Sequence, residues 1–63
     1  MKWVSQVTAK RGDFIDSYET REAFVIACQR LDRVVKAKKV RRELVYTTML
    51  FEHKTMWQIY LLP

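Results

Sequence analysis

The chain has 63 residues, a net charge of +5 and 49% hydrophobic residues, eight of its side chains being aromatic. This length suits one small domain, residues 1–63. One cysteine and one histidine exclude an intramolecular disulfide and a Cys/His zinc site within one chain, and we expect neither a cofactor nor a metal. The sequence lacks a membrane-spanning run and a signal-peptide pattern, and its unpaired cysteine suits a reducing compartment. We therefore expect a cytoplasmic protein without a membrane partner.

The N-terminal third is predicted to form a β-hairpin. Residues 3–9 (WVSQVTA) are rich in β-formers and alternate loosely. Residues 10–13 (KRGD) contain the only glycine, which accepts a positive φ in a tight turn. Residues 14–18 would form the return strand. Alternatively, this segment enters a helix directly, with Asp16 as the N-cap and Glu19 completing a capping box.

The clearest element is an amphipathic helix from Thr20 to about Lys39. Thr20 can accept a hydrogen bond from the first turn, and Glu22 lies near the positive end of the helix dipole. Seven apolar residues recur at a spacing that places them on one side of the helix. They are Ala23, Phe24, Ala27, Cys28, Leu31, Val34 and Val35.

A second hairpin is predicted after the helix. Residues 40–52 and 55–62 have the β-branched and aromatic residues typical of strands, and residues 52–55 (EHKT) form the turn between them. A loop of two or four residues, with Phe51 paired with Met56, gives the hairpin two apolar faces. One face holds Leu44, Tyr46, Thr48, Leu50, Trp57, Ile59 and Leu61; the other holds Val45, Thr47, Met49, Phe51, Met56, Gln58, Tyr60 and Leu62.

These elements predict an α+β fold, with a small antiparallel sheet of three or four strands. The order is β-hairpin, central helix, β-hairpin, and the helix packs on one face of the sheet. Because one helix covers only one face, we expect the second apolar face to meet a partner, as a homodimer or with another protein. The predicted interface residues are Tyr46, Met49, Phe51, Met56, Tyr60 and Leu62.

A basic cluster spans the end of the helix and the residues that follow it. Residues 29–42 contain seven of the twelve basic side chains and one acid, Asp32. Such a cluster favours contact with a polyanion, most of all with the phosphates of a nucleic acid. The sequence thus predicts a non-enzymatic nucleic-acid-binding protein. The predicted contact residues are Arg30, Arg33, Lys36, Lys38, Lys39, Arg41 and Arg42.

Two other functions are compatible with the sequence. The apolar sheet face or a free strand edge could serve a protein-interaction module, such as a small inhibitor or adaptor of the kind that phages and mobile elements encode. A third hypothesis is a metal-independent ribonuclease that uses His53, which lies between Glu52 and Lys54. Cys28 belongs to the apolar side of the helix, so we interpret it as a core residue.

Overall fold

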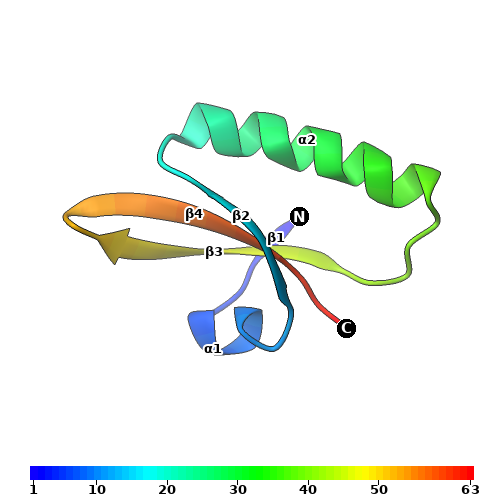
Figure 1. Cartoon of the computed structure of the whole chain (residues 1–63), viewed down its shortest axis with the longest axis horizontal. Coiled ribbons are helices and arrows are strands. Elements are labelled where there is room, and N and C mark those ends of the chain that lie inside the picture. Colours follow the sequence, from blue (N-terminus) through cyan, green and yellow to red (C-terminus); the bar gives the residue numbers. More distant parts are fainter.

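The computed structural model describes all 63 residues as a four-stranded sheet with a long helix on one face and a short helix on the other (Figure 1). The α+β class and the packing of one main helix on one sheet face are as predicted. Across the sheet the strands lie in the order β1-β3-β4-β2. The elements are β1 (Lys2–Trp3), α1 (Gln6–Ala9), β2 (Asp13–Tyr18), α2 (Arg21–Ala37), β3 (Leu44–Phe51) and β4 (Lys54–Leu61).

The long helix α2 starts where the sequence predicts. The side chain of Thr20 accepts a hydrogen bond from the backbone N–H of Ala23 at 3.2 Å, which caps the first turn. Asp16, the alternative N-cap, lies instead within β2. The inner side of α2 buries Phe24 and Ala27 against the sheet. The packed cluster also contains Leu44 and Ile59, with Tyr18, Cys28, Leu31, Val35, Tyr46, Trp57 and Leu61 around them.

The predicted C-terminal hairpin is confirmed, with a two-residue loop at Glu52 and His53. Phe51 pairs with Lys54 and Met49 with Met56, so the expected pairing of Phe51 with Met56 is wrong. The two predicted face sets still hold, because a loop with an even number of residues keeps the same alternation. Both loop residues have positive φ, 51° and 65°, as a type I′ turn requires. Neither residue is glycine, so the turn costs about 1–2 kcal/mol for each of them.

The predicted N-terminal hairpin is wrong. Residues 6–9 form α1, whose first turn is capped by the side chain of Ser5, which accepts from the N–H of Thr8 at 3.2 Å. The two residues of β1 pair in parallel with β3, and β2 pairs antiparallel with β4. The sheet is therefore mixed. β-propensity depends on the neighbouring strand and on burial, and residues 6–9 have no strand partner and only one buried side chain, that of Ala9.

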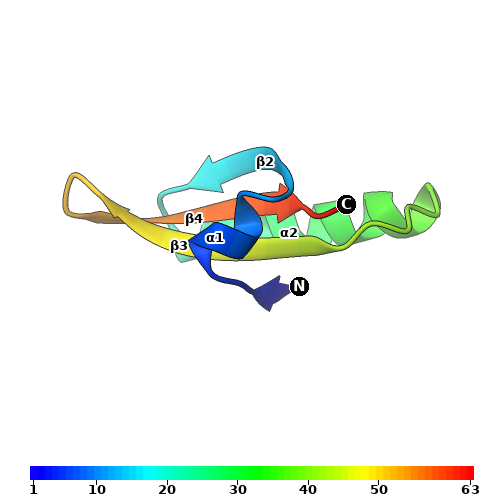
Figure 2. The same cartoon turned by 90° about the horizontal axis from the view of Figure 1, so that it is seen from below.

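The short helix α1 covers part of the second sheet face, which was expected to need a partner (Figure 2). Ala9 packs with Val45 and Tyr60 in a small second core. The side-chain amide of Gln6 donates to the carbonyl of Thr48 at 3.1 Å and so occupies an acceptor on that strand. No helix has the length and the apolar composition that crossing a membrane requires.

Candidate nucleic-acid interface

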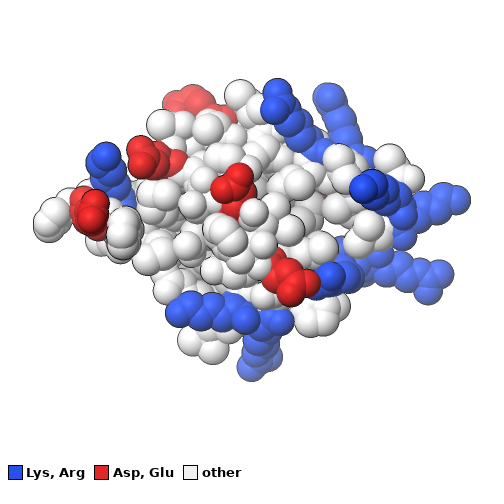
Figure 3. Space-filling view, viewed as in Figure 1, with Lys and Arg blue, Asp and Glu red and all other residues white.

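Most basic residues of the predicted interface lie at one end of the molecule, whereas Arg30 lies near the middle of α2. Arg30, Arg33 and Lys36 are on α2, and the other four lie at its C-cap or in the connection to β3. Figure 3 shows Lys and Arg side chains gathered at the end of the long axis where α2 ends, while most acidic side chains lie away from that end. The fold thus concentrates positive charge at a single pole of a body about 37 Å long.

Backbone hydrogen bonds alone cap the C-terminal end of α2, so the lysine side chains there take no part in the cap. The N–H of Val40 donates to the carbonyl of Val35 at 3.1 Å, and the N–H of Lys39 donates to that of Lys36 at 3.2 Å. This pair of bonds is a Schellman motif. Its left-handed position is Lys39, with φ of 52°, where glycine is the usual residue. A lysine therefore stands where a glycine would be less strained.

Six of the seven predicted residues carry charge that nothing in the chain neutralises. The structure has only two ion pairs: Lys2 with Glu43 at 3.5 Å, and Arg42 with Asp13 at 2.6 Å. The six have no carboxylate oxygen within 4.0 Å, and all six are exposed. We call them the basic end: Arg30, Arg33, Lys36, Lys38, Lys39 and Arg41.

Arg42 differs from the basic end because the fold itself uses its guanidinium. Its Nε donates to the carbonyl of Leu62 at 3.0 Å, and Nη2 donates to the carbonyl of Leu61 at 3.1 Å and to Asp13. These bonds hold the end of β4 against the start of β2. Gly12 lies at the same junction, where an added Cβ would come within 2.5 Å of the Leu61 carbonyl oxygen. Arg42 is therefore a structural residue as well as a predicted contact.

The residues of the predicted protein interface do not form one surface. Tyr46 lies beneath α2, its ring centroid 4.8 Å from that of Phe24, so it belongs to the covered face. Tyr60 is buried, with Phe14 edge-to-face against it at 5.5 Å, and Leu62 packs on the same small core. The remaining three, Met49, Phe51 and Met56, lie together near the hairpin turn; the two methionines are half-buried and Phe51 is exposed.

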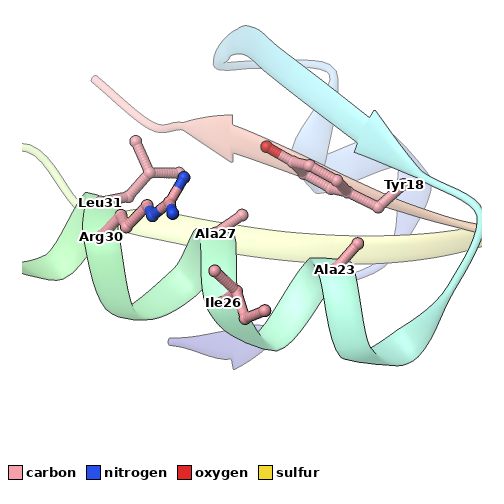
Figure 4. Close-up of a pocket in the computed structure, with 6 residues that line it drawn as sticks. All are labelled: Tyr18, Ala23, Ile26, Ala27, Arg30 and Leu31. Carbon is pink, nitrogen blue, oxygen red and sulfur yellow. The ribbon is translucent and has the colours of Figure 1, made fainter.

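The sequence gives no sign of a groove between α2 and β2, because the groove depends on where β2 lies. It has a volume of about 480 Å³ and is mostly apolar, with the Arg30 guanidinium and the Tyr18 hydroxyl as its polar groups (Figure 4). Burial, with the nearby Asp16 carboxylate, raises the pKa of Tyr18. The groove-lining residues are Tyr18, Ala23, Ile26, Ala27, Arg30 and Leu31.

The residues considered for other chemistry are dispersed. His53 lies in the exposed turn of the β3–β4 hairpin, between the exposed Glu52 and Lys54. Cys28 is half-buried in the main core, and burial raises the pKa of its thiol. No three His, Cys, Asp or Glu side chains are grouped so that they could hold a metal ion.

The chain matches no protein-family model, no curated protein and no solved structure. The candidate interface therefore depends on the position, exposure and charge of its own residues.

Proposed function

We propose that this protein is a non-enzymatic binding protein that engages the phosphate backbone of a nucleic acid through the basic end. One observation carries the proposal: six exposed cations without an ion-pair partner lie along the C-terminal half of α2 and the residues that follow it. An unpaired cation keeps its full charge for an external phosphate. Each phosphate neutralised by Lys or Arg releases condensed counterions, which is the main source of backbone affinity.

The backbone geometry at Lys39 gives separate support. A glycine there would adopt the positive φ without strain, whereas lysine keeps a cation in the middle of the basic end. The chain carries no motif for reading base edges, so we expect contacts to phosphate and sugar to dominate and sequence preference to be weak.

The test is to measure binding to a short DNA duplex, a single-stranded DNA and an RNA as salt is raised. If about four of the six cations contact phosphates, log K falls with log salt at a slope of about −3.6, and affinity drops roughly 150-fold between 50 and 200 mM salt. Affinity that is absent at low salt, or that hardly changes with salt, would refute the proposal.

A charge-matched pair of variants separates the basic end from net charge alone. K38E/K39E should weaken binding strongly. K10E/R11E, which alters an exposed basic pair at the α1–β2 turn by the same amount of charge, should weaken it much less. Equal losses in the two variants would mean that overall charge, not the basic end, governs binding.

Lys39→Gly separates folding from binding. The substitution should raise the free energy of unfolding by roughly 1 kcal/mol, because it relieves the left-handed strain. It should also lower nucleic-acid affinity, because it removes one cation. A variant that is both more stable and unchanged in affinity would exclude Lys39 from the contact.

The second candidate is a protein-interaction module of the inhibitor or adaptor kind. Exposed apolar side chains on the β3–β4 hairpin favour it: Leu50 is 75% and Phe51 is 56% exposed. A pull-down from the native host after nuclease treatment tests it. A specific protein that is still recovered after nuclease treatment would support the module. If the untreated sample contains nucleic acid and no specific protein is recovered from either sample, the module is contradicted.

A further inference from the structure

The sheet face opposite α2 is covered only at the open end of the β3–β4 hairpin. There α1 buries Val45 completely, and Thr47 is 1% exposed. Towards the turn burial falls, through the half-buried Met49 and Met56 to the exposed Phe51. Figure 2 shows the hairpin extending well past α1 on this face. We call the uncovered part, formed by Met49, Phe51 and Met56 with the exposed Lys54 at its edge opposite Phe51, the bare half of the face.

The helix that covers the other half has an apolar side chain turned away from its own sheet. Ala9 is fully buried, whereas Val7 is 73% exposed. Residues two apart on an α-helix point in nearly opposite directions, about 200° apart. Val7 therefore stands on the outer side of α1. One face of the molecule thus carries both a projecting ridge with an apolar tip and an apolar area without a cover.

The exposed area of the chain is larger than a monomer of its size requires. A monomeric protein of this mass exposes about 4300 Å², and this chain exposes 4864 Å². The excess of roughly 570 Å² is close to the roughly 800 Å² that each partner buries in a stable interface. This excess, a property of the whole elongated chain, is of the order of area that a contact with a second folded chain covers.

We propose that a second copy of this chain covers the bare half, so that α1 of each copy lies on the bare half of its partner. The two copies meet face to face. The two-fold axis lies in the plane of the interface and runs across the strands, so the strands of one copy run opposite to those of the other. Such an interface is isologous, so one surface must contain both a projection and the area that receives it. This face does, and that argues for a second copy over an unrelated protein.

In this dimer Val7 rests on Met49, Phe51 and Met56 of the other copy. The two α2 helices lie on the outside, because they cover the opposite sheet faces. The basic ends stay exposed and the dimer carries two of them. The proposal does not depend on nucleic-acid binding, and its failure would leave that function unaffected.

Sedimentation at tens of micromolar is the first experiment. The expected mass is twice the 7.6 kDa of the chain. Val7→Asp and Phe51→Lys should each raise the dimer dissociation constant roughly 30-fold or more, since each places a charge in the apolar part of the interface. Leu50→Lys is the matched control. Leu50 is the neighbour of Phe51 on the same hairpin, is 75% exposed and lies on the α2 face, so this variant should remain dimeric.

Mixing the variants tests the reciprocal arrangement. V7D and F51K chains, each of which dimerises weakly alone, should associate with each other when mixed. In the mixed dimer the two substituted positions meet in one contact and carry opposite charges, and the native Val7 and Phe51 meet in the other. Circular dichroism confirms that each variant is folded. A wild-type monomer at these concentrations, a loss of dimer in L50K equal to that in F51K, or a mixture that stays monomeric would overturn the proposal.

Discussion

Arg42→Ala removes the side chain whose hydrogen bonds join the end of β4 to the start of β2. The guanidinium makes two hydrogen bonds to backbone carbonyls, those of Leu61 and Leu62, and one ion pair with Asp13. Its side chain is 40% exposed, so solvent weakens each of these interactions. With roughly 1 kcal/mol for each carbonyl bond and less for the exposed ion pair, the expected loss is about 2 kcal/mol.

That loss is large for a chain of this length. A stability of 0.05–0.15 kcal/mol per residue gives about 3–9 kcal/mol in all, so Arg42→Ala should lower the melting temperature by roughly 8–16 °C. Thermal and urea unfolding followed by circular dichroism measure the change. The variant should unfold at a lower urea concentration with an unchanged slope, because the extent of the folded structure is the same.

Arg41→Ala is the control, since Arg41 is the adjacent residue, is exposed and has no ion-pair partner. It should change the free energy of unfolding by less than about 0.5 kcal/mol while weakening nucleic-acid binding. Asp13→Asn should lie between the two in stability, because it leaves both carbonyl bonds in place. If R42A and R41A are equally stable, the role assigned to Arg42 at the strand junction is refuted.

Two further outcomes follow from buried polar groups. Thr47→Val should raise the free energy of unfolding by about 1 kcal/mol, because the Thr47 hydroxyl is buried without a hydrogen-bond partner. Thr48→Val is the control, since Thr48 is only half-buried. Destabilisation by T47V in urea unfolding would contradict the prediction. Burial also raises the pKa of Cys28 from 9.0 and that of Tyr18 from 10.0, so the unfolded chain releases these protons first. The stability they contribute is complete below about pH 9 and is lost as the pH rises through their folded pKa values. The melting temperature measured from pH 8 to 11 should therefore fall. Near pH 9 it should fall less steeply in C28A than in the unsubstituted chain. A melting temperature that rises with pH would contradict the expected direction.

The elements that could be predicted are those whose information is local. The helix spacing and the capping Thr20 predict α2, and the alternation around residues 52–55 predicts the β3–β4 hairpin and its two faces. The basic end could be predicted as well, because its residues are nearly contiguous along the chain. In each case the residues that define the element lie within a few turns or one hairpin of one another.

The features that could not be predicted depend on distant partners. Residues 6–9 hold two β-formers and two helix formers, so propensity leaves their state open; in the structure β1 pairs with β3 far along the chain, and Ser5 caps a helix immediately after β1. The role of Arg42 depends on three segments meeting at one point, and its neighbour Arg41 has the same side chain. Local propensity cannot distinguish these outcomes, because tertiary pairing decides them.

The strand order β1-β3-β4-β2 also bears on how the chain folds. Both strands from the N-terminal third lie on the flanks of a hairpin that comes later in the sequence. The β3–β4 hairpin is the only pair of neighbouring strands joined by a tight turn, so we expect it to form early and to serve as the template to which β1 and β2 add. During synthesis the first two strands would therefore wait for their partners until β3 and β4 have left the ribosome. Until then the apolar side of α2 has no sheet to cover it, and this is the stage at which the chain is most open to aggregation.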